Sequence, residues 1–285
     1  MGSGVKNREV LTGDVLRELQ GVLELGRYSY TSAQRGLRPH THGTALEICL
    51  LAKGKQTYRL DGRIYRVKGG DQFVAFPREI HDTGGEPEGK GVLYWLILDI
   101  APSRTGFLQL APLAARLLVT ALCRLPARHF RADPTARASL DRVFEALNGS
   151  DQLRTVRAAN WLVTYLLKTV AAAASGELPA ISKVIQAAQD RVAAAPDDEW
   201  ITVPELAAHV GQSISYFKAR FKAETGTPPA EFVTRRKIDR AQKLLEAPGA
   251  TVTSVAYDLG FSSSQYFATV FRRYMMRAPS DLLGQ

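Results

Sequence analysis

The sequence predicts an α+β protein with an antiparallel β-barrel near the N-terminus, a helical segment after it and an all-α domain at the C-terminus. Three observations predict this arrangement. Between residues 22 and 100, apolar residues recur with a period of two in short runs, which is typical of strands. From about Pro102 the apolar period becomes helical. The last third then repeats one two-helix pattern twice. We therefore expect three regions, at residues 1–100, 101–178 and 183–285.

The barrel is expected from short strands that follow one another without helices between them. Asp61-Gly62 is a strong hairpin signal, because a type I′ turn requires positive φ at both central residues. Gly54 and Gly69-Gly70 predict further turns. Residues 1–20 resemble a polar arm with one or two helical turns. The expected strands cover residues 22–30, 46–51, 56–60, 64–67, 73–76 and 92–100.

Helical periodicity predicts three helices in the middle region, over residues 108–125, 134–147 and 153–174. The third has a broad apolar face that either packs on the barrel or forms a dimer seam with a second copy, and the sequence leaves both open. Ser175–Pro179 has linker composition, so we place the domain boundary near residues 176–182. The apolar face comprises Val156, Trp161, Leu162, Tyr165, Leu166, Thr169 and Val170.

Composition predicts a cytoplasmic protein. No apolar run approaches the roughly 20 residues needed to span a bilayer, and residues 1–20 lack the apolar stretch of a secretory signal. Cys49 and Cys123 lie far apart in apolar stretches, so we interpret them as reduced core residues, with sensing thiols as the alternative. The net charge is +9, yet residues 183–285 contain 13 basic and 11 acidic side chains, so total charge does not locate a DNA site.

A group of potential metal ligands lies in the barrel region. His40 and His42 are two residues apart, so on a strand both point to the same side. Glu47 joins them only if the chain bends at Gly43-Thr44, and His81 would arrive from a neighbouring strand. Three imidazoles and one carboxylate suit Zn, Fe, Mn or Ni.

The spacing His40-x-His42-x4-Glu47-x6-Gly54, followed by Gly70-Asp71 and Pro77-x3-His81, resembles the two cupin motifs. It departs from them in lacking a glycine six positions before His40 and in a Pro-to-His spacing that is one residue shorter. The resemblance implies that the four residues either hold a divalent metal, as in cupin enzymes, or line an effector pocket, as in the sensor cupins of regulators. We include Arg38 and Trp95 in the expected pocket, where the indole ring would stack on a sugar. The alternative is a surface arginine and a core tryptophan.

In each copy of the C-terminal repeat, a short helix ends at a glycine and a serine precedes a second helix. The first copy spans Val203–Lys222 and the second spans Val252–Arg272. This pattern is typical of a helix-turn-helix, whose second helix enters a groove of DNA. A helix from Pro228 or Pro229 to about Glu246 would be about 27 Å long at about 1.5 Å per residue. It would space two recognition helices along one side of a duplex.

Residues 183–283 resemble the AraC family of transcription regulators. The resemblance implies a dimer that responds to a small molecule, with the barrel as the sensor. Ala219 and Thr269 depart from the family pattern, which commonly has arginine there, and Met276 replaces a common glycine. The matching residues are Leu206-Ala207, Tyr216-Phe217, Phe221-Lys222, Gly226-Thr-Pro228, Phe232, Arg236, Ala241, Leu244-Leu245, Val255-Ala256, Gly260-Phe261, Tyr266-Phe267, Phe271 and Pro279.

Helical spacing separates the faces of the recognition helices. Phenylalanine pairs four residues apart should face the core, which leaves polar residues for DNA. Gln can bond adenine, Lys can donate to guanine, and Ala or Thr methyls can touch thymine. The expected base-reading residues are Ser215, Lys218, Ala219, Ser264, Gln265 and Thr269. The expected phosphate contacts are Ser213, Arg220, Lys222, Arg235, Arg236, Arg240, Ser263, Arg272 and Arg273. For Arg220, Arg235, Arg236, Arg240 and Arg273 the alternative is a contact with acidic neighbours.

The leading hypothesis is a sequence-specific transcription regulator of the AraC type, not an enzyme, controlled by an effector in the barrel. Its expected partners are duplex DNA, a small molecule such as a sugar, a second copy of the chain and RNA polymerase, with no membrane. The alternative is a metal-dependent cupin enzyme or metal sensor joined to a DNA-binding domain. A third reading makes the barrel a dimerisation module only.

Overall fold

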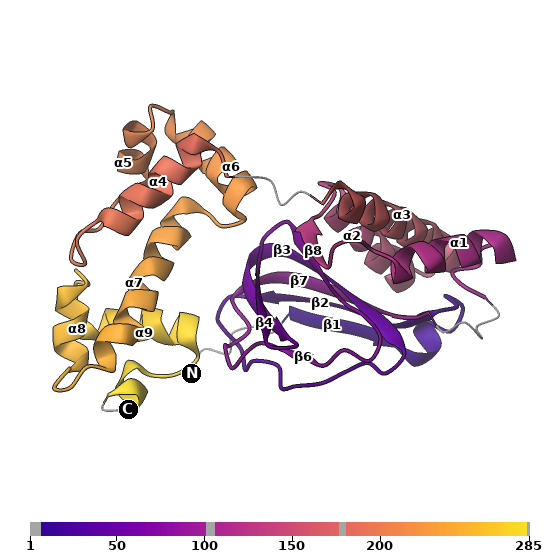
Figure 1. The fold of residues 1–285 in the computed structure, drawn as a ribbon, viewed down its shortest axis with the longest axis horizontal. Helices are drawn as coiled ribbons and strands as arrows, with labels where there is room; N and C mark the ends of the chain where they lie inside the picture. The colour runs from indigo at the N-terminus through magenta and orange to yellow at the C-terminus, as the bar shows by residue number, and fades with distance from the viewer. Residues whose placement is uncertain (1–6, 101–105, 177–180, 284–285) are drawn as a thin grey trace.

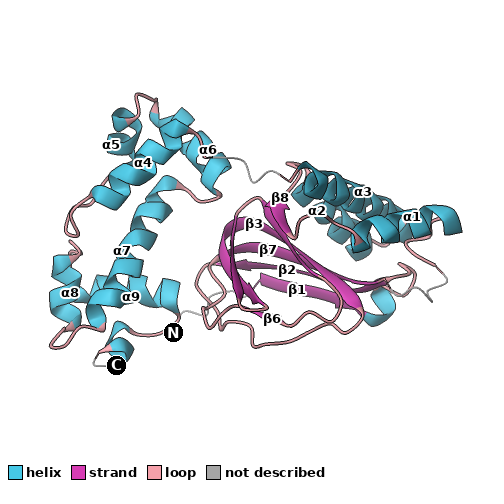
Figure 2. Cartoon of the chain, viewed as in Figure 1, coloured by secondary structure: helices cyan, strands magenta, loops and turns pink. Residues whose placement is uncertain are grey.

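A strand-rich N-terminal part and a helical C-terminal part make up the molecule (Figure 1). The computed structural model describes residues 7–100, 106–176 and 181–283. The boundaries expected near residue 101 and within 176–182 fall mainly at residues 101–105 and 177–180, which lie outside the described residues. None of the helices in the described ranges is long and apolar enough to cross a membrane. The predicted α+β class is confirmed (Figure 2).

The N-terminal part is built on one antiparallel sheet in the order β1-β2-β7-β3-β5-β8. β4 and β6 pair with the far half of β3 and curl the sheet toward a barrel. The strands are β1 (Asn7–Thr12), β2 (Val22–Tyr30), β3 (Ala45–Leu60), β4 (Arg63–Lys68), β5 (Asp71–Ala75), β6 (His81–Asp82), β7 (Gly91–Asp99) and β8 (His129–Arg131).

The strand predictions were correct in position but wrong in one connection. The runs 46–51 and 56–60 belong to one 16-residue strand, β3. Gly54, with φ of 106°, does not reverse the chain; it lies where β3 stops pairing with β7 and starts pairing with β4. The turn at Asp61-Gly62 is confirmed, with φ of 48° and 75° at its two residues. The N-terminal arm is not mainly helical, because β1 pairs along β2 and only the short 3-10 turn Gly13–Val15 follows.

The sheet has two apolar faces, which explains why its central strands are nearly continuous in apolar residues. One face, with residues such as Ile48 and Leu96, packs against helices α1 (Pro112–Cys123), α2 (Ala136–Asn148) and α3 (Arg154–Ser175). The other face lines the barrel interior and includes Tyr58, Phe73 and Trp95. Figure 1 shows the three helices covering one side of the sheet.

The apolar face predicted for α3 is divided by the structure. Leu162, Tyr165 and Leu166 are fully buried, whereas Val156 and Trp161 are exposed. The predicted core position of Cys123 is wrong, because its side chain is exposed at the end of α1, while Cys49 is buried as expected. α3 therefore packs on the domain with one face and leaves a second face open.

The C-terminal part contains two small cores joined by α7. One core is formed around α4, α5 and α6, and the other around α8 and α9, with α7 contributing to both. The elements are α4 (Lys183–Ala194), α5 (Val203–His209), α6 (Ile214–Thr225), α7 (Pro229–Leu245), α8 (Val252–Asp258), α9 (Ser264–Met275) and the 3-10 turn Pro279–Leu282. In Figure 1 α7 runs between the α4–α6 group and the α8–α9 group.

Candidate functional site

The recognition helices α6 and α9 are positioned by the same local devices. Ser213 and Ser263 accept hydrogen bonds from the backbone N–H groups of Tyr216 and Tyr266, so each helix begins with a serine cap. The pairs Phe217–Phe221 and Phe267–Phe271 are fully buried, with ring centroids 5.4 and 5.6 Å apart. Burial of these pairs turns the opposite face of each helix to solvent.

The residues expected to read bases lie on those outward faces. All are exposed except Ser264, which is half-buried. The hydroxyl of Thr269 donates to the carbonyl of Gln265 at 3.0 Å, which leaves the threonine methyl free for an apolar contact with a base. The two faces thus differ: Lys218 and Ala219 on α6, Gln265 and Thr269 on α9.

Four of the expected phosphate contacts fall into two groups. Lys222 and Arg272 are exposed, and each lies in the last turn of a recognition helix. Arg220 and Arg235 instead pair along their own helices, with Glu224 and Asp239, each at 2.8 Å. Surface pairs of this kind are weak, so both arginines can exchange an acidic neighbour for a phosphate.

Arg236 and Arg240 also have partners within the fold. Arg236 donates to the carbonyls of Ala193 and Ala195 at 3.0 and 2.8 Å. Those carbonyls belong to the end of α4, where helix geometry leaves them unpaired. Arg240 donates to Asp197 at 2.7 Å. The spacing on α7 placed both side chains outward. Arg240 is indeed exposed, whereas Arg236 is half-buried against the end of α4, which spacing alone could not show.

Tyr216 and Tyr266 are functional candidates that the sequence prediction missed. Each is the third residue of its recognition helix, and they are 58% and 53% exposed. A tyrosine hydroxyl at that position can donate to a phosphate or sugar oxygen. The repeated Tyr-Phe pair was the available signal, since only the phenylalanine of each pair is needed for the core.

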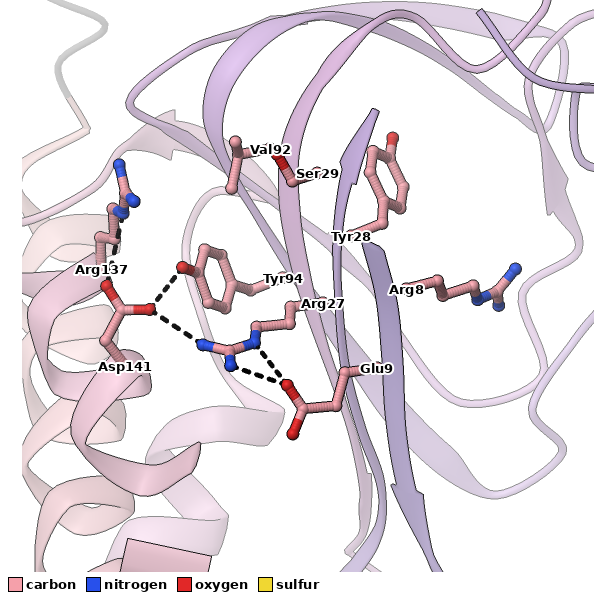
Figure 3. Close-up of a pocket in the computed structure, with 9 residues that line it drawn as sticks. All are labelled: Arg8, Glu9, Arg27, Tyr28, Ser29, Val92, Tyr94, Arg137 and Asp141. Atoms are coloured by element: carbon pink, nitrogen blue, oxygen red, sulfur yellow. Dashed lines mark hydrogen bonds and ion pairs between the residues drawn. The ribbon is translucent and has the colours of Figure 1, made fainter. Parts of the chain in front are cut away.

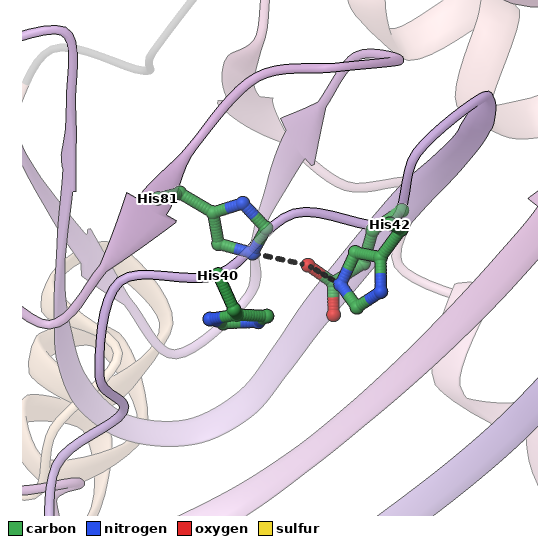
Figure 4. A group of neighbouring side chains, drawn as sticks. His40, His42 and His81 are labelled. Carbon is green, nitrogen blue, oxygen red and sulfur yellow. Dashed lines mark ion pairs between the residues drawn. The ribbon is translucent and has the colours of Figure 1, made fainter.

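The four potential metal ligands converge, and Figure 4 shows His40, His42 and His81 gathered together. Gly43 has φ of 60°, which provides the bend that brings Glu47 to the histidines. His40 pairs with His81 through two backbone hydrogen bonds of 3.1 and 3.0 Å. One ligand atom from each of His40, His42, Glu47 and His81 lies within 4.8 Å of all the others.

The hydrogen bonding of this group fits a metal ion. Glu47 Oε2 is 2.8 Å from His81 Nε2 and 3.5 Å from His42 Nε2, yet none of these three atoms has a properly oriented hydrogen bond among the described residues. Buried polar atoms without partners are rare and costly. Burial raises the pKa of Glu47, but His42 and His81 outweigh it and bring the pKa to about 2. A carboxylate ready beside three imidazoles is a suitable donor set for a divalent transition metal.

The remaining expected pocket residues are placed differently from each other. Trp95 is buried in the barrel interior, where its ring covers Gly26 and its indole N–H donates to Glu24. Arg38 is exposed on the loop before His40 and does not line the interior. Only its backbone carbonyl takes part, accepting from His40 Nδ1 at 2.8 Å.

Polar groups outside the expected pocket set also face the interior; the sequence left Tyr28 as a possible lining residue that spacing could not assign, and it did not indicate Glu88. Tyr28 stacks on Tyr30 with ring centroids 3.9 Å apart, and its buried hydroxyl has no hydrogen-bond partner among the described residues. Glu88 is buried nearby, and burial raises its pKa to about 7, opposed by Arg8. These groups come from strand ends and loops, where spacing alone does not show which way a side chain points.

A cavity of about 360 Å³ lies outside the expected pocket (Figure 3). Its lining includes Arg27, Tyr94 and Asp141, from β2, β7 and α2. The charges within it pair with one another: Arg27 lies 2.7 Å from Glu9, and Tyr94 donates to Asp141 at 2.6 Å. These mutual pairs leave little unsatisfied polarity for a ligand.

The barrel and the helical part touch through the ends of helices. Gly69 and Gly226 approach so closely that a Cβ on either would lie within 2.5 Å of the other's backbone. Lys68 Nζ donates to the carbonyl of Glu224 at 3.2 Å, and Lys90 pairs with Glu231 at 3.3 Å. A second contact joins Arg273 of α9 to the loop after β2, where Ala33 N donates to the Arg273 carbonyl at 2.8 Å.

Comparison with known protein families matches both parts of the molecule. A family model described as "AraC-like ligand binding domain" matches residues 23–160, and one described as "Helix-turn-helix domain" matches residues 206–285. Fold and family models together define a DNA-binding transcription regulator with an N-terminal ligand-binding domain. The chain belongs to the AraC-type transcriptional regulators.

Individual relatives agree with this family. A putative AraC-like transcription regulator of Streptomyces lividans is 36% identical over 86 residues, which are 30% of this chain and only 28% of that protein. The transcriptional activator RhaS of Klebsiella pneumoniae (strain 342) is 24% identical over 252 residues, which are 86% of this chain and 87% of that protein.

Solved structures resemble the chain only loosely. ToxT from Vibrio cholerae O395 is 14% identical over 90% of this chain and 94% of its own, with a TM-score of 0.34. The DNA-binding domain of AdpA, solved with a target DNA, is 29% identical over 35% of this chain and 86% of its own, with a TM-score of 0.31. At these TM-scores neither structure constrains the arrangement of the two parts.

Proposed function

We propose that this regulator reads an asymmetric DNA site with α6 and α9 and changes its DNA binding when a small molecule enters the barrel. The observation that supports base reading is the pair of capped helices with different exposed faces, Lys218 and Ala219 on one and Gln265 and Thr269 on the other. Different faces should recognise different half-sites within one monomer's footprint.

Base reading is tested with Lys218→Ala and Gln265→Ala, measuring affinity for a selected cognate duplex and for random duplex. Loss of one base contact should lower cognate affinity by about 1–3 kcal/mol and random affinity much less. Lys183→Ala, an exposed lysine on α4, is the matched control for loss of charge. Equal losses on both duplexes would reject base reading, and absence of any salt-dependent duplex binding would reject the proposal as a whole.

The effector is proposed to bind in the barrel interior near Trp95 and Tyr28. The buried hydroxyl of Tyr28 without a partner and the adjacent aromatic rings suit a small polar molecule such as a sugar. The expected observation is a rise in melting temperature with one class of metabolite in a panel. Tyr28→Phe should weaken that rise, whereas no rise with any compound would favour a barrel used only for dimerisation.

Assembly as a homodimer is part of the same proposal. Leu113 and Leu117 on α1 and Val156 and Leu167 on α3 are large apolar side chains that are more than half exposed. Apolar faces of this kind commonly mark an interface. Sedimentation of Leu117→Glu beside the unchanged protein tests it, and a dimer unaffected by the change would place the interface elsewhere.

These assignments give each region of the chain a proposed role. Residues 1–100 form the cupin-like sensor, residues 101–178 the helical dimerisation segment and residues 183–285 the DNA-binding domain. The site of action would be the cytoplasm, where the chromosome lies. A regulator bound beside a promoter would act through RNA polymerase, which in vitro transcription on a cognate promoter would test.

A metal-dependent activity is the second candidate function, and the cluster of His40, His42, Glu47 and His81 favours it. A bound divalent ion would supply a Lewis acid at the barrel mouth. Elemental analysis of the protein and of His42→Ala tests binding. Stoichiometric metal that is lost in the variant would support a metal site, and only turnover of a substrate would then separate an enzyme from a metal sensor.

A further inference from the structure

One short segment of the chain connects the His/Glu cluster to the second recognition helix. At its start, the Thr31 carbonyl accepts from Arg273 Nε at 2.9 Å, and Ala33 N donates to the Arg273 carbonyl at 2.8 Å. At its end lie His40 and His42 of the cluster. We call residues 31–42 the connecting segment.

The connecting segment is held along its length by residues 81–88. Gln34 N donates to the Glu88 carbonyl at 2.9 Å, and the Leu37 carbonyl accepts from Thr83 N at 3.4 Å. At Gly36 the two segments are so close that a Cβ on this residue would lie 2.1 Å from the Glu86 carbonyl oxygen. We therefore expect a change in how the segment lies at the cluster to alter the backbone that bonds Arg273.

The contact with the connecting segment occupies the side chain of Arg273, which is one of the expected phosphate contacts. Arg273 lies in the last turn of α9, and its carbonyl is one of those that a helix end leaves unpaired. The backbone N–H of Ala33 donates to that carbonyl, and the Thr31 carbonyl accepts a hydrogen bond from the Arg273 guanidinium. As long as both bonds are made, Arg273 is held against the barrel. Its neighbour Arg272 is also exposed, and it is not part of the hydrogen bonds that join α9 to residues 31–33.

We propose that a divalent transition metal ion binds His40, His42, Glu47 and His81 and thereby locks the connecting segment onto Arg273, which lowers affinity for DNA. The four ligands come from the connecting segment, β3 and β6, so they converge only while the segment lies against residues 81–88. The ion thus binds the locked arrangement better than any other, which is the condition for a ligand to shift an equilibrium. This inference rests on the proposed DNA binding.

The effect must be reciprocal. If metal lowers the affinity for DNA by some factor, DNA lowers the affinity for metal by the same factor. Coupling of the usual size gives a change of at least about fivefold. Withdrawal of one phosphate contact should also reduce the slope of log affinity against log salt concentration by about 0.9.

The test uses the full-length protein, freed of metal with a chelator, with Zn²⁺ as the probe. Calorimetry should show one equivalent of Zn²⁺ bound, and binding should be lost in His42→Ala and in His40→Ala. Two ligand variants are used because one of them could fail to fold. A thermal melt of each variant would reveal this. Zn²⁺ should weaken duplex binding about fivefold or more in the unchanged protein.

The variants Arg273→Ala and Arg272→Ala distinguish an effect of Zn²⁺ through the connecting segment from a general effect of Zn²⁺ on DNA binding. Arg273→Ala should still bind Zn²⁺, bind duplex as weakly as the Zn²⁺-loaded protein and no longer respond to Zn²⁺. Arg272→Ala should lose duplex affinity but keep its full response. Absence of Zn²⁺ binding, or an unchanged response in Arg273→Ala, would overturn the inference. Absence of duplex binding with Zn²⁺ binding intact would instead reject the proposed function.

Discussion

Gly226 and Met276 occupy equivalent positions at the ends of the two recognition helices, and both are in the left-handed conformation. Their φ angles are 71° and 59°, and each backbone N–H donates four residues back, to Lys222 and Arg272. A non-glycine residue in this conformation is strained by about 1–2 kcal/mol. Both recognition helices therefore end in a left-handed residue, although only Gly226 can adopt that conformation without strain.

Replacement of Met276 with glycine should stabilise the protein. Relief of the left-handed strain should raise the free energy of unfolding by about 1 kcal/mol, measured by urea denaturation. Met275→Gly, one residue earlier and still helical, should lower it by a similar amount. Loss of stability in Met276→Gly would mean that the methionine side chain stabilises the fold more than its backbone strains it.

The opposite change at Gly226 should be strongly destabilising. A Cβ there would lie 2.3 Å from the Gly69 backbone nitrogen, so Gly226→Ala adds a clash with the barrel to the strain of the left-handed conformation. Gly211→Ala is the control, since Gly211 has φ of 66° with open space around its Cβ position. Differential scanning calorimetry should show a lower and broader transition for Gly226→Ala, and equal melting temperatures would argue against this contact in solution.

Stability should fall as pH rises from about 5 to 8 because of Glu88. Burial raises its pKa to about 7, with Glu47 adding to the rise and Arg8 opposing it, so the folded protein holds a proton that the unfolded chain releases near pH 4.5. At about 1.4 kcal/mol per pKa unit, the loss is at most about 3 kcal/mol. Glu88→Gln should flatten this part of the stability curve, and a slope unchanged by the substitution would assign it to another group.

Lys237 should be essential to the helical domain despite its charge. It is buried, and its ammonium donates to the carbonyls of Asp197 and Leu259, the latter at 3.0 Å. Lys237→Met would leave both carbonyls without this partner, that of Leu259 in a buried position, and should cost about 2–3 kcal/mol in the free energy of unfolding. Lys243→Met, at an exposed position on the same helix, should change it by less than about 0.5 kcal/mol. Equal effects would contradict this role.

The helical domain was predictable almost residue by residue, because its signals are local. Capping serines, glycines after short helices and phenylalanine pairs each act within about one helical turn. The predicted hairpin at Asp61-Gly62 was correct for the same reason. Convergence of the four barrel ligands was also within reach, since the need for a bend at Gly43 followed from strand geometry.

What the sequence could not show depends on contacts between distant segments. Arg236 resembles any surface arginine until the end of α4 is placed beside it. Gly54 resembles any turn glycine, although it allows one strand to pass between two sets of partners. The exposed position of Arg38 and the contact of Arg273 with Thr31 likewise depend on how loops fold over one another.

The buried ammonium of Lys237 and the continuous helix α7 tie the two helix-turn-helix units into one body. α7 has 17 residues, which correspond to about 26 Å at about 1.5 Å per residue. A body of fixed length fixes the helical phase of the DNA that it can bind. Insertion of about five base pairs between the two half-sites would turn the second half-site to the far side of the duplex. Such an operator should retain only the affinity of a single unit, and a full-turn insertion should not rescue it, because α7 cannot lengthen.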